Sequence, residues 1–184
     1  GELVVHPAAG HRVAGGGDHL RRPLRAGAGL VGLVVWIGLL APFVPTARAE
    51  PWSTPAFVLR LVSAGLVVPL FEELIMRGFV FRFGLQWHRA WRDRVREPLH
   101  TALDRRSVNE VEPGGWTWFA VLLSMLVFTS GHALHEWPAA LAYGLLMALL
   151  WMHRRDLISC VTAHAVTNIS LALFVLATGS WQYW

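Results

Sequence analysis

The stretch that decides the fold is Phe71-Glu72-Glu73-Leu74-Ile75-Met76-Arg77, which lies inside an otherwise apolar segment, residues 56–83. A charged side chain at the centre of a membrane helix costs roughly 2.5–3.5 kcal/mol on insertion scales. A segment that only anchored the chain would not carry two carboxylates and a guanidinium together. The stretch therefore predicts a functional site within a membrane-spanning helix.

The composition of the whole chain supports a membrane protein. The chain has 184 residues, of which 54% are hydrophobic and 15% are charged, and its mean hydropathy is +0.44. These values are too apolar for an ordinary soluble domain. At roughly 20 residues per span, we expect an all-α, polytopic transmembrane bundle of about five spans. The lone Cys160 cannot form an intrachain disulfide.

Apolar segments and polar connections divide the chain. We expect residues 1–25 to form a flexible cytoplasmic lead and residues 26–184 to form the helical bundle, with a cytoplasmic loop at 86–115. The expected helices are residues 26–44, 56–83, 116–131, 139–152 and 157–178. Trp36 lies in the middle of the first segment, away from the interfaces where tryptophan usually sits, so we assign it to packing.

Arginine distribution predicts the orientation of these segments. The 16 basic residues are all arginine, and they are dense before the first segment, in the 86–115 loop and after the fourth segment. The positive-inside rule places these regions, and the N-terminus, in the cytoplasm. A nucleic-acid partner is not expected, because the arginines gather at the ends of apolar segments, where topology and anionic lipid explain them.

The tandem carboxylates have two separate roles in this reading. Glu73 and Arg77 are four residues apart and share a helix face, so they can form an ion pair. Glu72 is rotated by about 100° and can point elsewhere, which leaves it available as a general base. A buried ion pair that only ties helices together is the structural alternative.

Two later apolar segments carry further polar side chains. His132 lies near the outer end of the third segment, one turn after Phe128, and could also be an ordinary helix-end histidine. His164 and Asn168 are four residues apart in the fifth segment. Their aligned donors could stabilise an oxyanion, or they could form hydrogen bonds that join helices.

The ordered set Glu-Glu-x-x-x-Arg, Phe-x-x-x-His and His-x-x-x-Asn, each on its own apolar segment, resembles the CPBP family of CAAX proteases and bacteriocin-processing proteins, also called Abi. The match covers about residues 69–178. The resemblance implies a glutamic-type intramembrane endopeptidase without a metal cofactor. It also implies that Glu72 and His132 activate water, that His164 and Asn168 form an oxyanion hole, and that Glu73, Arg77 and Phe128 support the site.

The resemblance further implies the partners and the location. The expected substrate is a membrane-tethered protein or peptide in the lipid bilayer, and the expected location is a bacterial inner membrane with the N-terminus in the cytoplasm. The end of the chain, residues 178–184, resembles CAAX prenyl protease-related proteins that accompany exosortase systems. This likeness suggests a functional link to such a system.

Two other functions compete with this interpretation. The first is a zinc metalloprotease with Glu72, His132 and His164 as ligands and a metal-bound water. The absence of a His-Glu-x-x-His motif weakens it. The second is a membrane scaffold, immunity protein or transporter that uses the buried charges for assembly or proton relay. A hydrolase requires Glu72 and His132, whereas a scaffold should tolerate their conservative replacement.

Overall fold

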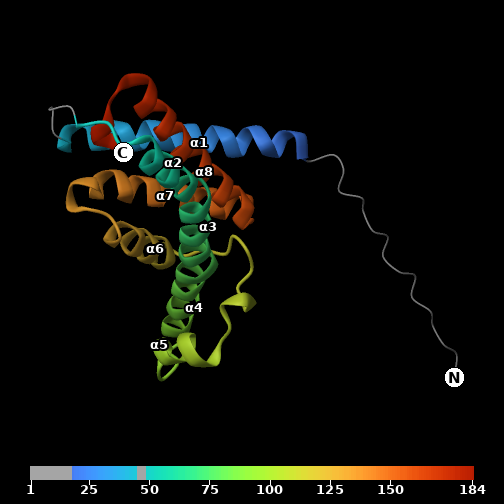
Figure 1. Cartoon of the computed structure of the whole chain (residues 1–184). Helices are drawn as coiled ribbons and strands as arrows, with labels where there is room; N and C mark the ends of the chain where they lie inside the picture. The colour runs from blue at the N-terminus through green and yellow to red at the C-terminus, as the bar shows by residue number, and fades with distance from the viewer. Residues whose placement is uncertain (1–17, 45–48) are drawn as a thin grey trace, which may run out of the picture.

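The computed structural model describes residues 18–44 and 49–184, and it is built from helices (Figure 1). No strand occurs within these described residues. The prediction of an all-α membrane bundle is confirmed. Three helical stretches are long and apolar enough to cross a membrane: Pro23–Phe43, Thr54–Arg92 and Leu157–Thr178. Trp118–Ser130 is a shorter apolar helix.

The first helix begins earlier than the sequence predicted. α1 spans Asp18–Leu40 and ends in a 3-10 turn, Ala41–Phe43. Residues 18–25 therefore belong to a helix and not to a flexible lead, and the rest of the predicted lead lies outside the described residues. Pro23 lies inside α1, where it removes one backbone N–H from the helical hydrogen bonds.

The second predicted segment is a single long helical stretch with two π-helical insertions. It consists of α2 (Thr54–Val62), a π-helical stretch η2 (Ser63–Val67), α3 (Val68–Glu73), a second π-helical stretch η3 (Leu74–Val80) and α4 (Phe81–Arg92). π-Helical insertions are rare and are frequent at functional sites. Here they flank the short α-helix that carries Glu72 and Glu73.

The predicted loop 86–115 is wrong over its first residues, because α4 continues to Arg92. Leu85, Gln86 and Ala90 are buried while Arg89 and Arg92 are exposed. This segment is an amphipathic helix end, so its polar side chains do not mark a loop. The connection that follows contains three short helices, α5 (Pro98–His100), η4 (Thr101–Arg105) and η5 (Val108–Glu110).

The remaining helices follow the predicted order. α6 spans Trp118–Ser130, and α8 spans Leu157–Thr178 as predicted. α7 spans Trp137–Arg154, so it is longer at both ends than the predicted residues 139–152. Short 3-10 turns precede α7 at Leu134–Glu136 and follow α8 at Trp181–Tyr183.

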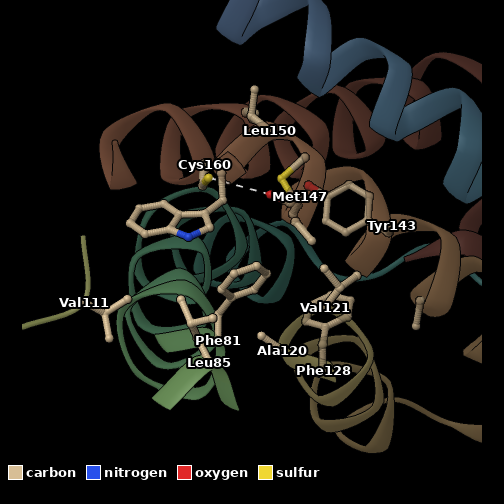
Figure 2. Close-up of a cluster of buried hydrophobic side chains, with 14 residues drawn as sticks. Phe81, Leu85, Val111, Ala120, Val121, Phe128, Tyr143, Met147, Leu150 and Cys160 are labelled. Carbon is tan, nitrogen blue, oxygen red and sulfur yellow. Dashed lines mark hydrogen bonds between the residues drawn. The ribbon is translucent and has the colours of Figure 1, made fainter. Parts of the chain in front are cut away.

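The apolar core lies where α4, α6 and α7 meet. Figure 2 shows Phe81 and Leu85 of α4 grouped with Val121 of α6 and Met147 of α7, and all four side chains are buried. Cys160 of α8 joins this cluster, and its thiol donates to the carbonyl of Met147 at 3.9 Å. The lone cysteine is therefore a packing residue.

Close contact between α1 and its neighbours requires glycine. A Cβ added at Gly29 would lie 2.6 Å from the carbonyl oxygen of Ala163. A Cβ at Gly32 would lie 2.6 Å from Thr167 Oγ1 and 2.7 Å from a ring carbon of Tyr143. Small residues let membrane helices approach closely where lipid gives no hydrophobic driving force. Gly29 and Gly32 thus bring α1 onto α7 and α8.

Candidate active site

A cavity of about 390 Å³ contains the four predicted catalytic side chains. Glu72 comes from α3, His132 follows the end of α6, and His164 and Asn168 come from α8. Phe128 also lines this cavity. Three segments that are distant in sequence therefore bring the predicted residues to one concave site.

The predicted ion pair between Glu73 and Arg77 is present and fully buried. Arg77 Nη1 lies 3.2 Å from Glu73 Oε2, and both side chains have zero exposure. Arg77 Nη2 also donates to the carbonyl of Gly144 at 2.9 Å. Hydrogen bonds to both partners offset the desolvation of this guanidinium. The pair fixes α3 and η3 against α7, which supports the site as the sequence suggested.

Glu73 also contacts His164, which the sequence did not reveal. His164 Nδ1 lies 2.9 Å from Glu73 Oε1. An ionised carboxylate can only accept, so Nδ1–H is the donor, and this contact fixes the orientation of the ring. His164 Nε2 then faces Glu72, 3.8 Å from its Oε2. Glu73 is thus placed to position His164 as well as to pair with Arg77.

Glu72 and Glu73 differ sharply in exposure, as their helical rotation predicted. The Glu72 side chain is 30% exposed, whereas that of Glu73 is not exposed. Glu72 therefore reaches the cavity, where water can approach it, while Glu73 stays within the protein.

A backbone carbonyl fixes the orientation of the His132 ring through Nδ1. His132 Nδ1 lies 3.0 Å from the carbonyl oxygen of Phe128, which can only accept. Nδ1–H is therefore the donor, and in the neutral ring Nε2 is left with its lone pair. The Phe128 ring packs 4.6 Å from the His132 ring and 5.9 Å from the guanidinium of Arg77, measured between centres. Phe128 separates the buried ion pair from the histidine.

Asn168 is held by the backbone carbonyl of Ala64, which has no hydrogen-bond donor within its own helix. Val68 N–H bonds to Ser63 in the π-helical stretch, and Pro69 has no N–H. The carbonyl of Ala64 therefore lacks its usual helical donors, and Asn168 Nδ2 donates to it at 2.8 Å. One amide hydrogen and the carbonyl oxygen of Asn168 remain to face the cavity.

Sequence reasoning did not assign Trp36 and Tyr143 to the site, although both contact its histidines. Tyr143 is buried with its ring 5.3 Å from that of His164, and it donates to Thr167 at 3.1 Å. Trp36 packs with its ring 5.4 Å from that of His132. Both Trp36 and Tyr143 line the cavity. The position of Trp36 in the middle of an apolar segment was the available signal, and it was assigned to packing alone.

Polar side chains also line the cavity at one end. Arg60 of α2 lies with its guanidinium 5.0 Å from the ring centre of Trp52 and 5.3 Å from that of Trp184. Glu136 lies in the turn between α6 and α7, where its carboxylate accepts from the backbone N–H of Ala133 at 2.9 Å. Arg60, Glu136 and Tyr183 all line the cavity.

The zinc alternative requires His, Cys, Asp or Glu side chains that could bind one metal ion together. Within residues 18–44 and 49–184, no three His, Cys, Asp or Glu side chains lie in an arrangement that could hold a metal ion. Glu72 and His164 do approach each other, and His164 directs its second nitrogen to Glu73. A carboxylate in that position can orient a metal-binding histidine as well as a metal-free one.

A partly exposed carboxylate, two oriented histidines and an asparagine meet at one cavity among apolar helices. The comparisons with known proteins identify the family of the chain. A model of the Type II CAAX prenyl endopeptidase Rce1-like family matches residues 54–170, more than half of the chain. The chain belongs to this family. No curated protein and no solved structure matches it.

Proposed function

We propose that this protein is a glutamic-type intramembrane endopeptidase that cleaves a membrane-tethered substrate. The observation that carries this proposal is the convergence of Glu72, His132, His164 and Asn168 on one cavity. Membership of the CAAX protease family supports peptide hydrolysis in general. The assignment of each residue to a step is our proposal.

In the proposed reaction, Glu72 removes a proton from a water molecule, and His132 Nε2 holds that water by accepting its second hydrogen. The hydroxide forms a bond to the carbonyl carbon, and the carbonyl oxygen becomes an oxyanion. Hydrogen bonds from Asn168 Nδ2 and His164 Nε2 stabilise this oxyanion. The C–N bond then breaks, and Glu72 returns its proton to the leaving amine.

His164 must carry a proton on Nε2 to donate to the oxyanion. Its Nδ1–H is committed to Glu73, so the donating form of the ring is the imidazolium. Two carboxylates flank this cation, Glu73 at 2.9 Å and Glu72 at 3.8 Å.

The substrate and location follow from the family and the arginine distribution. We propose a membrane-tethered protein or peptide with a CAAX-like end or a C-terminal sorting signal, cleaved within a bacterial inner membrane. The N-terminus is proposed to be cytoplasmic. A functional link to an exosortase system stays a prediction that rests on the resemblance of residues 178–184.

Replacement of the proposed base tests the mechanism. We expect Glu72→Gln to lower proteolysis by about 10²-fold or more, because the amide keeps the volume of the side chain but cannot accept the proton. The measurement is cleavage of a membrane-tethered reporter by the purified protein. Glu110→Gln is the matched control, because Glu110 is exposed in the loop before α6. Near-normal cleavage by Glu72→Gln would show that Glu72 is not the general base.

Metal analysis separates this mechanism from the zinc alternative. We expect purified protein that has been stripped of metal to keep full activity. One zinc per chain, lost together with activity in His164→Ala, would instead establish the metalloprotease. Unaltered function of Glu72→Gln and His132→Ala in cells would favour a scaffold or immunity protein.

A further inference from the structure

We infer that Arg60 is a carboxylate-binding residue of the catalytic cavity, so that the protein selects substrates with a carboxylate close to the scissile bond. This inference rests on the proposed function for the identity of the cavity. It adds a specificity-determining residue outside the three sequence motifs. The position of Arg60, its aromatic contacts and its charged neighbours each support this role.

Arg60 and Glu72 line the same cavity from one helical stretch. Arg60 belongs to α2, and Glu72 belongs to α3 twelve residues later in the stretch Thr54–Arg92. At 1.5 Å per residue, their backbone positions are at most about 18 Å apart along the axis. An extended peptide covers this length in about five residues. A carboxylate a few residues from the scissile bond can therefore reach the guanidinium.

Aromatic rings hold the guanidinium of Arg60. It lies 5.0 Å from the ring centre of Trp52 and 5.3 Å from that of Trp184. The Trp184 ring packs in turn 5.5 Å from the ring of the buried Phe57, measured between centres, and Figure 1 shows the C-terminus beside α2. Contact with a ring face uses the charge of the cation but none of its N–H donors. The side chain is therefore positioned with its donors still available.

The ion pairs of the bundle do not include Arg60. Arg77 lies 3.2 Å from Glu73, and Arg154 lies 3.8 Å from Asp156. Among the described residues, no carboxylate lies within ion-pair distance of Arg60. Arg60 is also exposed. Its planar guanidinium can therefore bind both oxygens of an incoming carboxylate, which is the strongest form of charge-assisted hydrogen bonding.

The other ionisable groups of the cavity do not supply this function. Glu72 and Glu136 line the cavity and repel a second carboxylate when ionised. His132 and His164 hold the water and the oxyanion in the proposed reaction. Arg60 is the only arginine among the described residues that line the cavity. A negative group of the substrate therefore has one permanent cation to bind there.

A peptide carries a carboxylate at its C-terminus or on an aspartate or glutamate side chain. Three forms of a fluorescent prenylated CAAX peptide separate these sources. The first has a free C-terminal carboxylate and no acidic side chain. The second is the same peptide with a C-terminal amide. The third has the amide and one glutamate among its last three residues.

Binding of the three peptides is measured by fluorescence anisotropy with the full chain in detergent. The measurement uses the Glu72→Gln background, so that the peptide stays intact. Arg60→Gln removes the charge, whereas Arg60→Lys keeps the charge without the planar guanidinium. Arg92→Gln is the matched control, because Arg92 is exposed at the end of α4 and does not line the cavity.

We expect the chain with Arg60 to bind a carboxylate form about tenfold or more tightly than the second peptide, which has none. Arg60→Gln should abolish this preference, Arg60→Lys should keep part of it, and Arg92→Gln should keep all of it. Preference for the first peptide identifies the C-terminal carboxylate as the ligand, and preference for the third identifies a side chain.

Equal binding of all three peptides by the chain with Arg60 would overturn the inference, and so would a preference that survives Arg60→Gln. Arg60 would then be an anchor at the membrane interface. The first of these comparisons needs no change at Arg60, so it stands even if Arg60→Gln does not fold. Mass spectrometry of the peptides afterwards shows whether Glu72→Gln still cleaves them, which would refute the proposed base and not the carboxylate site.

Discussion

His164 is the residue on which the site depends most, because it lies between two carboxylates with different environments. Glu73 is buried and binds Nδ1, whereas Glu72 is half-exposed and faces Nε2. The ring is therefore held by Glu73 at Nδ1, while Nε2 is the atom that donates in the proposed reaction. Glu72 and Glu73 can approach different nitrogens of the same ring because consecutive side chains on a helix point in different directions.

Glu73 provides the first prediction at this scale. We expect Glu73→Gln to destabilise the protein by about 3–5 kcal/mol, because it leaves the buried Arg77 without its counter-charge. The double variant Glu73→Gln with Arg77→Gln should recover part of this stability, measured as thermal unfolding in detergent. It should remain inactive, because no carboxylate then holds Nδ1 of His164. Full activity in the double variant would show that Glu73 has no positioning role.

Asn168 provides the second prediction at the scale of single residues. If it donates to the oxyanion, Asn168→Ala should cost about 2.7–4 kcal/mol in transition-state stabilisation. The loss should fall on kcat, with KM little changed, because the interaction forms only in the transition state. Thr178→Ala is the control on the same helix, since Thr178 is exposed and its hydroxyl bonds only to the backbone of Phe174 and Ser180 among the described residues. A change confined to KM would contradict the oxyanion role.

At the scale of elements, the long helix from Thr54 to Arg92 explains how polar residues are tolerated in the membrane. Its π-helical stretches and Pro69 free the carbonyl of Ala64, and Asn168 satisfies that carbonyl. The irregularity of one helix is thus matched by a polar side chain of another. In lipid, an unsatisfied backbone group would cost several kcal/mol, so this match stabilises both elements.

The contact of α1 with α7 and α8 leads to a prediction about glycine. We expect Gly32→Ala to destabilise the protein by about 1–3 kcal/mol, because the added methyl would overlap Thr167 and Tyr143. Activity should fall with stability, since Tyr143 packs on His164. Gly38→Ala is the control on the same helix, because a Cβ there meets nothing within 4 Å. Thermal unfolding in detergent measures both, and equal effects would contradict the close contact.

At the scale of the whole molecule, arginines gather at one end of the bundle. Arg25, near the start of α1, and Arg154, at the end of α7, both lie 3.8 Å from Asp156 at the start of α8. The loop before α6 also reaches this end, because Gly114 packs against Arg155. The positive-inside rule predicts that the arginine-rich end faces the cytoplasm.

This polarity predicts the outcome of reporter fusions. The predicted five-span arrangement places a reporter at Asn109 in the cytoplasm and one after Trp184 on the other side of the membrane. The measurement is the activity of a reporter that works in only one compartment. Both reporters on the same side would contradict the five-span arrangement.

The sequence by itself determined the class of this protein. Its hydropathy predicted the membrane bundle, and spacings of four residues predicted the pair of Glu73 with Arg77 and the shared face of His164 with Asn168. These features are local, since a helix fixes which neighbours share a face. The ordered motifs predicted the family, and the match to residues 54–170 confirms it.

Only the tertiary structure decided how these pieces meet. The contact of Glu73 with His164 joins residues 91 positions apart, and the contact of Asn168 with Ala64 joins residues 104 apart. The extension of α4 to Arg92 was also hidden, because an amphipathic helix end and a polar loop have the same composition. Trp36 and Tyr143 joined the cavity for a similar reason, since a helix pattern shows which face is apolar but not which helix packs against it.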